Sequence, residues 1–253
     1  MSKVELYLGD CIPIMASWNR QFDMILADLP YGTTACKWDT VIPFELLWEQ
    51  YKRLIKPKGA IVLFGSQPFT SALVMSNVEW FKYEWVWDKN SGSNFLNAKI
   101  MPLSTHESIL VFADTMPNYY PIMTKRETVK RCKARSKVYG ANGQSAYGKR
   151  KATFGIYTHR YPKSIVPVSN ANQKAKKHPT QKPVALLEYL VKTYTNEGET
   201  VLDNTMGSGS TGVACVNTGR GFAGIELLPE YFDIAQERIE KAQSEMIQAR
   251  LPI

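Results

Sequence analysis

An acid, a proline and an aromatic residue follow a short apolar run near the start of the chain. The run, 22–27, has the character of a buried strand, and the residues after it are Asp28, Leu29, Pro30 and Tyr31. The Asp28 carboxylate and the Leu29 carbonyl can accept hydrogen bonds from an amine, and Pro30 fixes the turn that presents them. Such acceptors favour the pyramidal form of an exocyclic base amine, and Tyr31 suits stacking on an extruded base. A turn-capping Asp28 and a packed Tyr31 are the alternative.

Three glycines near the end of the chain form a second motif. Gly207, Gly209 and Gly212 spell GxGxxG between a predicted strand and a predicted helix, and Glu226 lies 19 residues beyond Gly207. This arrangement is typical of nucleotide-cofactor sites, in which the acid accepts hydrogen bonds from ribose hydroxyls. A purely structural tight turn is the alternative.

The surroundings of the glycine motif favour S-adenosylmethionine over a dinucleotide. Asp203 precedes the loop, with no basic residue beside it to offset its repulsion of a pyrophosphate. A sulfonium and an ammonium group would be attracted instead. Only 27 residues follow Glu226, too few for the remaining strands of a dinucleotide domain. We therefore expect upstream strands to complete the sheet.

The positive charge of the chain is concentrated in one segment. The net charge is +8, but 125–182 holds 16 lysines and arginines against one acid, Glu127, while the remainder holds 15 basic and 22 acidic residues. Aromatic residues are interspersed: Tyr139, Tyr147, Phe154, Tyr157 and Tyr161. Cations and aromatics together suit phosphate backbones and bases, so nucleic acid is the expected partner. A solvated basic loop is the alternative.

Strands and helices are predicted to alternate on both sides of this segment. Strands are expected at 4–8, 22–27, 60–64, 80–87, 108–112, 200–202 and 221–225. Helices are expected at 14–18, 44–55, after Pro68, at 183–194, at 211–217 and from Pro229. This alternation indicates an α/β fold with a doubly wound, mostly parallel sheet.

Composition excludes several other classes of protein. The 253 residues are 44% hydrophobic and 21% charged, and no apolar run approaches the ~18 residues that span a bilayer. The four cysteines form no CxxC pair, and His106 and His159 have no ligand spacing, so neither disulfides nor a metal site are expected. The start of the chain turns polar too soon for a signal peptide, and we expect a cytoplasmic protein.

Five strings in order resemble one family. The strings DLPYG, LFGSQPF, HPTQKP, DNTMGSGSTG and GRGFAGIELLPEY are similar to motifs of the amino-group DNA methyltransferases, which make N6-methyladenine or N4-methylcytosine. The catalytic turn precedes the glycine loop, as in the beta arrangement of that family. The resemblance implies a Rossmann-like methyltransferase fold: a catalytic part (1–113), a basic target-recognition insert (114–177) and a cofactor-binding part (178–253).

The resemblance also implies roles for particular residues. Asp28, Leu29, Pro30 and Tyr31 would hold the target amine. The expected contacts to S-adenosylmethionine come from Asp10, Cys11, Asp28, Thr180, Lys182, Asp203, Asn204, Met206, Gly207, Ser208, Gly209, Thr211 and Glu226. Within HPTQKP, His178, Thr180 and Lys182 match the segment that touches the cofactor carboxylate, with a helix-entry turn before Pro183 as the alternative.

The implied substrate is an adenine flipped out of double-stranded DNA and methylated at N6. The leading Asp28 favours adenine, with N4 of cytosine as the alternative. Leu29 departs from the usual proline pair, which keeps the carbonyl but lowers the rigidity of the turn. A protein glutamine methyltransferase and an inactive nucleic-acid binder are more remote alternatives. The recognised DNA sequence, a homodimer and a restriction partner are left open.

Overall fold

The chain forms two compact units in the computed structural model, which describes residues 3–33, 39–132, 155–170 and 181–250. The larger unit comprises Met1–Tyr120 and Ser164–Ile253, and the smaller unit comprises Pro121–Lys163. The smaller unit lies inside the expected insert and is shorter at both ends. At its carboxyl-terminal side, residues 165–167 add a strand to the sheet of the larger unit.

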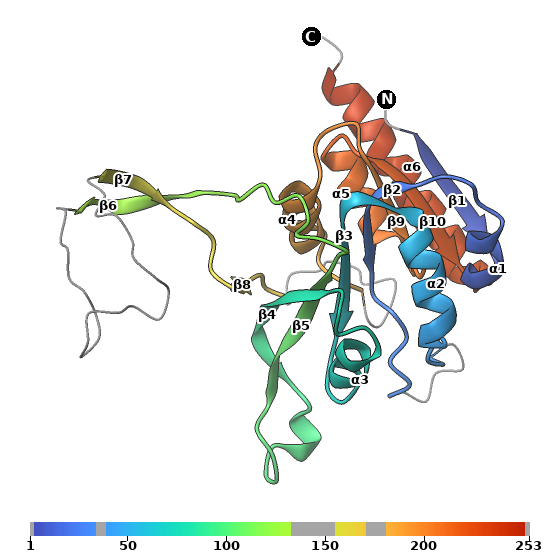
Figure 1. The fold of residues 1–253 in the computed structure, drawn as a ribbon, viewed down its shortest axis with the longest axis horizontal. Coiled ribbons are helices and arrows are strands. Elements are labelled where there is room, and N and C mark those ends of the chain that lie inside the picture. Colours follow the sequence, from blue (N-terminus) through green and yellow to red (C-terminus); the bar gives the residue numbers. More distant parts are fainter. Residues whose placement is uncertain (1–2, 34–38, 133–154, 171–180, 251–253) are drawn as a thin grey trace. The chain divides into compact units, whose positions relative to one another are not determined.

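An eight-stranded sheet forms the centre of the larger unit (Figure 1). Its strands, in spatial order, are β1 (Val4–Leu8), β10 (Gly221–Glu226), β9 (Thr200–Asp203), β2 (Phe22–Ala27), β3 (Ile55–Gly65), β5 (Ser104–Phe112), β4 (Phe81–Ser93) and β8 (Ile165–Pro167). The pairs from β1 to β3 are parallel, whereas β5 runs antiparallel to both β3 and β4. The α/β, mostly parallel sheet expected from the sequence is confirmed, and upstream strands complete it because β9 pairs with β2 and β10 with β1.

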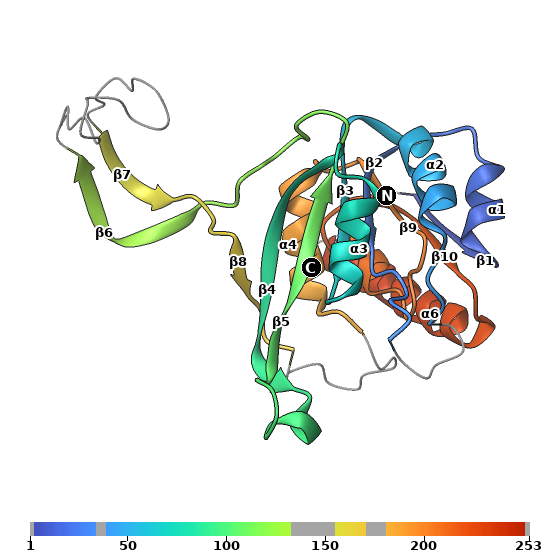
Figure 2. The ribbon, with the colours of Figure 1, turned by 60° about the horizontal axis from the view of Figure 1, so that its bottom comes forward.

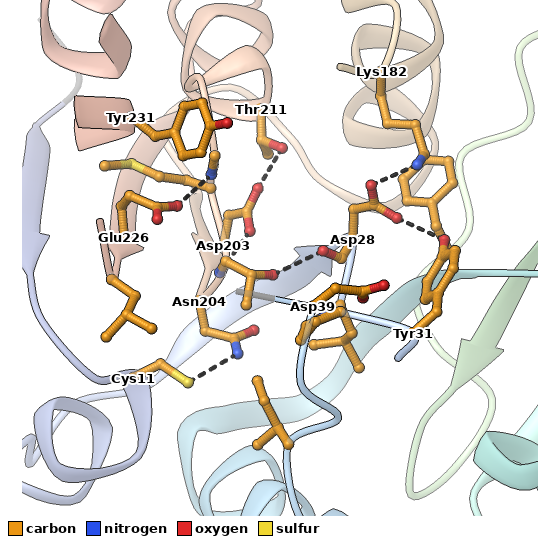
Figure 3. Close-up of a pocket in the computed structure, with 18 of the residues that line it drawn as sticks. Cys11, Asp28, Tyr31, Asp39, Lys182, Asp203, Asn204, Thr211, Glu226 and Tyr231 are labelled. Carbon is orange, nitrogen blue, oxygen red and sulfur yellow. Dashed lines mark hydrogen bonds and ion pairs between the residues drawn. The ribbon is translucent and has the colours of Figure 1, made fainter. Parts of the chain in front are cut away.

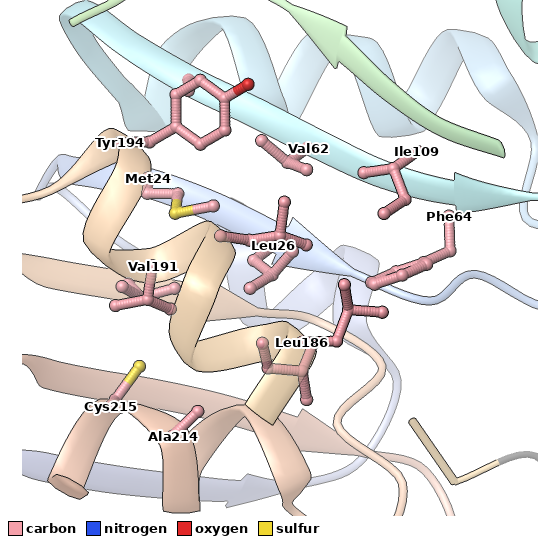
Figure 4. Close-up of a cluster of buried hydrophobic side chains, with 14 of the residues drawn as sticks. Met24, Leu26, Val62, Phe64, Ile109, Leu186, Val191, Tyr194, Ala214 and Cys215 are labelled. Carbon is pink, nitrogen blue, oxygen red and sulfur yellow. The ribbon is translucent and has the colours of Figure 1, made fainter. Parts of the chain in front are cut away.

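Helices cover both faces of the sheet. They are α1 (Cys11–Ala16), α2 (Phe44–Leu54), α3 (Phe69–Ser76), α4 (Val184–Tyr194), α5 (Ser210–Asn217) and α6 (Pro229–Arg250), with a 3-10 turn at Phe95–Asn97. Met24 and Leu26 of β2 pack on the α4 side, while Ile25 and Ala27 pack on the α2 side. Figure 4 shows the α4 side. This two-sided burial explains why β2 is a continuous apolar run and not an alternating one.

The start of β3 differs from the expectation. The tetrad at 56–59 was expected to separate a helix from a strand beginning at Ala60, but the strand begins at Ile55 and contains the tetrad. The register with β2 shifts between the Phe22–Ile55 and Met24–Ala60 pairs. Lys58 has a φ of 62° within this irregular stretch. The tetrad therefore forms an irregular, bulged start of β3 in its pairing with β2.

The smaller unit contains a two-stranded antiparallel sheet. Its strands are β6 (Thr124–Cys132) and β7 (Gly155–Arg160). The sequence analysis identified no strand here. Across the described residues of both units, no helix combines the length and apolar character that crossing a membrane requires.

Candidate active site at the carboxyl edge of the sheet

A cavity of about 550 Å³ opens at the carboxyl ends of the parallel strands. It brings the residues after β2 together with the loop after β9, which are about 175 positions apart in the sequence (Figure 3). The predicted site residues among its lining are Asp10, Cys11, Asp28, Leu29, Pro30, Tyr31, Lys182, Asp203, Asn204, Met206, Gly207, Ser208, Thr211 and Glu226. Gly209 is not among the lining residues, and His178 and Thr180 fall outside the described residues.

The glycine loop adopts a conformation that other residues disfavour. Gly207 and Gly209 have φ values of 51° and 77°, in the left-handed region that favours glycine. A Cβ atom on Gly212 would lie 2.3 Å from the Cδ1 of Ile239 and 2.8 Å from the ring of Phe222. The third glycine of the motif is therefore required for α5 to approach α6 and β10, as the sequence pattern predicts.

Glu226 is the last residue of β10, and its carboxylate is fixed from two sides. Its Oε2 accepts a hydrogen bond from the Gly207 amide at 2.9 Å, and its Oε1 accepts one from the Leu228 amide at 2.9 Å. Burial raises the pKa of this carboxyl. The carboxylate is therefore held at the cavity wall, and the ribose contact expected of it stays a prediction.

Asp203 ends β9 as a deeply buried acid. Its Oδ2 accepts a hydrogen bond from the Thr211 hydroxyl at 2.6 Å, and its Oδ1 accepts one from the Thr205 amide at 3.1 Å. Burial raises the pKa of Asp203 to about 7, despite these two hydrogen bonds. A carboxylate in such a place gains from a cationic ligand, because a nearby positive charge offsets its desolvation.

The start of α1 forms another part of the cavity wall. Asp10 caps this helix, because its Oδ1 accepts a hydrogen bond from the Ile12 amide at 2.9 Å. The Asn204 side chain donates to the Cys11 Sγ at 3.5 Å and accepts from the Tyr51 hydroxyl at 2.5 Å. These bonds lock the β9 loop onto α1 and α2.

The turn after β2 is held by its own aromatic residue and by the glycine loop. The Tyr31 hydroxyl donates to Asp28 Oδ1 at 2.7 Å, and the Tyr31 ring stacks on Phe69 with a centroid distance of 4.9 Å. The Thr205 hydroxyl donates to the Asp28 backbone carbonyl at 3.1 Å. Leu29, which replaces a proline of the family pattern, is buried in the core cluster beside α2. Packing of this side chain therefore anchors the turn.

Lys182 lies against Asp28 in this structure. Its Nζ is 2.5 Å from Asp28 Oδ2 and 3.3 Å from Glu107 Oε2, and Lys89 binds the other oxygen of Glu107 at 2.8 Å. Burial works against the charge of Lys182, but the two carboxylates outweigh it and raise its pKa. The cofactor contact expected of Lys182 stays a prediction.

The sequence analysis missed three residues that shape the site. Glu107 and Lys89 form the ion pairs just described. Asp39 accepts hydrogen bonds from the amides of Gly32 and Thr33, at 2.9 and 2.8 Å, and so fixes the turn after Tyr31. None of the three belongs to a recognisable string. An acid within the apolar strand before Ile109 was the one available signal for Glu107.

A family model described as DNA methylase matches residues 22–237. The type II methyltransferase M.HpaI of Haemophilus parainfluenzae is 27% identical over 237 residues, covering 88% of this chain and 69% of that protein. The DNA adenine methyltransferase YhdJ of Escherichia coli (strain K12) is 29% identical over 238 residues, covering 87% of this chain and 76% of that protein.

Solved structures show the same fold. The crystal structure of an M1.HpyAVI–SAM complex superposes with a TM-score of 0.64 at 26% identity, covering 93% of this chain and 98% of that chain. The PvuII DNA methyltransferase, described as cytosine-N4-specific, superposes with a TM-score of 0.65 at 14% identity, covering 98% and 94%. At this identity the second likeness concerns the fold alone.

Proposed function

This chain belongs to the DNA methylase family, and from that premise we propose that it transfers a methyl group from S-adenosylmethionine to N6 of an adenine in double-stranded DNA. The main support for the proposal is the contact between the turn after β2 and the glycine loop after β9. The Thr205 hydroxyl of the glycine loop binds the Asp28 carbonyl at 3.1 Å. A methyl donor bound along the loop therefore lies beside the acceptors for a target amine.

The donor set of the cavity fits S-adenosylmethionine. Glu226 offers a fixed acceptor for a ribose diol, Asp203 offers a buried anion for a cationic group, and Asp10 offers an acceptor for the adenine amine. The cations among the described lining residues are Lys89 and Lys182, and each is paired with a carboxylate. This set suits a cationic cofactor better than a pyrophosphate. The related M1.HpyAVI structure, described as a complex with SAM, supports the same cofactor.

S-adenosylmethionine supplies an electrophilic methyl group when bound. The chain's part is to orient the target amine. The Asp28 carboxylate has about four lone-pair sites, and Tyr31 and Lys182 occupy two of them. The remaining sites and the Leu29 carbonyl are available to accept the N–H bonds of an adenine amine. These bonds favour the pyramidal amine, whose lone pair would form the new N–C bond as the S–C bond of the sulfonium breaks, after which one amine proton is released. The ring of Tyr31 stacks on Phe69, and it would lie beside the adenine ring of the substrate.

Adenine is proposed over cytosine on two grounds. The turn begins with Asp28, which in the resembled family is more typical of adenine enzymes than of cytosine enzymes. YhdJ, a relative that matches 87% of this chain, is described as a DNA adenine methyltransferase. Expression in a bacterial host without its own DNA methylases tests the base: host DNA digested to nucleosides should contain N6-methyladenine. N4-methylcytosine in its place would correct the base and keep the mechanism.

Cofactor binding is expected to weaken in acid because of Asp203. The pKa of this carboxyl is about 7 in the free protein, and a bound cation favours its ionised form. Binding therefore releases a proton, and the Kd for S-adenosylmethionine should be roughly tenfold higher at pH 6 than at pH 8. Calorimetric titrations at the two pH values measure this difference. Asp203→Asn should bind weakly with no such dependence, and an equal pH dependence in this variant would contradict the assignment.

The smaller unit is proposed as the target-recognition part. Its described strands and their flanks carry the basic residues Lys125, Arg126, Lys130, Arg131, Arg160 and Lys163. Tyr157 and Tyr161 are exposed among them. Cations and exposed aromatics on one hairpin suit the backbone and bases of DNA.

DNA affinity should depend strongly on salt. If the basic segment contacts about six phosphates, the logarithm of the association constant should fall with log salt at a slope near −5 (about −0.9 per phosphate). Fluorescence anisotropy of a labelled duplex, titrated at salt concentrations from about 50 to about 200 mM, measures the slope. Replacing Lys130 and Arg131 with alanine should make it shallower by about 2. An unchanged slope would remove this hairpin from the binding surface.

A further inference from the structure

The strands β4 and β5 continue past the edge of the sheet at which the cavity opens. Gly65, the last residue of β3, is level with Ser108 of β5 and Val86 of β4. The β4–β5 pair then continues to Ser93 and Ser104, with a register shift between Asp88 and Ser93. Ser104 precedes Ser108 by four residues along β5. With a strand rise of ~3.3 Å per residue, the β4–β5 pair extends about 13 Å beyond the end of β3. Figures 1 and 2 show this hairpin projecting from the larger unit.

The tip of this hairpin, residues 94–103, presents large apolar side chains to solvent. Leu96 is 100% exposed, Ile100 78% and Phe95 69%. None of the three belongs to either core cluster. An exposed apolar group of this kind on a soluble domain indicates a contact surface.

The tip is internally braced. Asn97 donates to the Asn94 side chain at 2.7 Å, and the amides of Ile100 and Met101 donate to the Asn97 carbonyl at 2.9 and 3.0 Å. Asn94 adopts a φ of 67°, which makes the turn possible. The apolar side chains are therefore displayed from a structured frame.

Ion pairs join the base of the hairpin to the catalytic turn. Lys89 of β4 binds Glu107 of β5, Glu107 contacts Lys182, and Lys182 binds Asp28. Between Asp88 and Glu107 the chain has no acid and two lysines, Lys89 and Lys99. A polyanion that brings a base to Asp28 would therefore pass the hairpin without electrostatic repulsion.

We propose that the hairpin tip packs Phe95, Leu96 and Ile100 against the DNA duplex and fills the gap left when the target base leaves the stack. Extruding a base costs a few kcal/mol of stacking and pairing, and apolar wedges commonly occupy opened base steps. This inference rests on the proposed function, and it identifies the surface that performs the opening step.

The triple variant Phe95→Ser, Leu96→Ser, Ile100→Ser tests the proposal. Met75→Ser is the control, because Met75 is 73% exposed near the end of α3, outside the hairpin and outside the cavity lining. The substrate is a duplex oligonucleotide that contains the site methylated by the wild-type protein, found by sequencing methylated DNA. The same duplex with an abasic position opposite the target base is the second substrate.

We expect the triple variant to methylate the paired duplex roughly tenfold or more slowly than the control, a loss of about 1.4 kcal/mol or more. On the abasic duplex the loss should shrink to about threefold or less, because the target base is already unpaired. The Kd for S-adenosylmethionine should not change.

Three outcomes would overturn the inference. They are an undiminished rate on the paired duplex, an equal loss on both substrates, or a loss that accompanies dissociation of a dimer in sedimentation and is recovered at higher protein concentration. The last outcome would identify the tip as a contact between two copies of the chain. A wild-type protein that methylates no DNA would remove the proposed function itself, and the inference with it.

Discussion

Asp28→Ala should lower kcat for methyl transfer by about 1000-fold or more, or about 4 kcal/mol, while the Kd for S-adenosylmethionine changes by less than about fivefold. The variant removes the carboxylate that would accept the amine N–H bond. It also removes the partner that Lys182 contacts at 2.5 Å. The cofactor contacts proposed for Glu226 and Asp203 do not pass through this side chain. Single-turnover transfer and calorimetric binding measure the two effects separately.

Two controls sharpen this prediction. Asp114→Ala removes an exposed acid outside the cavity and should leave both quantities unchanged. Asp28→Asn keeps the size of the side chain and one acceptor oxygen, so it should retain more activity than Asp28→Ala. Wild-type turnover in Asp28→Ala would show that the turn after β2 is not catalytic.

Glu226→Ala should raise the Kd for S-adenosylmethionine by about 100-fold, or about 3 kcal/mol. The proposed reason is the loss of charge-assisted hydrogen bonds to the ribose hydroxyls. The same carboxylate holds the amides of Gly207 and Leu228, so the loop loses a brace as well. Equilibrium dialysis with labelled cofactor measures the change in affinity.

A stability measurement separates ribose binding from loop bracing. The difference in melting temperature between the variant and the wild-type chain, measured without cofactor, reports only the loss of the Glu226 hydrogen bonds to the Gly207 and Leu228 amides. Glu226→Gln keeps an oxygen for one amide and should bind the cofactor more tightly than Glu226→Ala. Glu230→Ala, an exposed acid on α6, is the matched control. If the cofactor binds Glu226→Ala as tightly as it binds the wild-type chain, the ribose assignment is wrong.

The parallel part of the fold was predictable from the sequence. Its strands are short apolar runs that end at polar residues, and the glycine loop places β9 and α5 in a known order. The sequence analysis expected upstream strands to complete the sheet, but it did not assign the partners, which are β2 for β9 and β1 for β10. Local patterns sufficed for β2, β9 and β10 because these strands are buried on both faces.

The β4–β5 hairpin was not predictable to its full length. The strands were expected at 80–87 and 108–112, whereas they run to Ser93 and from Ser104. The added stretch is rich in Asn, Ser and Gly, which have low strand propensity. The register of the two strands shifts between Asp88 and Ser93, and their pairing resumes at Ser93 and Ser104. Single-residue patterns do not report such pairing.

The partners of the catalytic acid were also beyond the sequence. Asp28, Lys182 and Glu107 lie on segments far apart in the chain, and only the folded sheet brings them within ion-pair distance. The motif strings identified Asp28 and Lys182 separately. They assigned Lys182 to the cofactor, whereas the structure pairs its ammonium with Asp28.

Methyl transfer by the purified protein is the most direct test of the account. The protein is incubated with S-adenosylmethionine that carries an isotopically labelled methyl group and with mixed unmethylated double-stranded DNA, and the DNA is digested to nucleosides for mass spectrometry. We expect the label in N6-methyladenine, with an initial rate of labelling lower by about 1000-fold or more when Asp28→Ala replaces the wild-type chain. An unlabelled digest, with the cofactor still bound to the protein, would contradict the assignment of this chain as an active DNA methyltransferase.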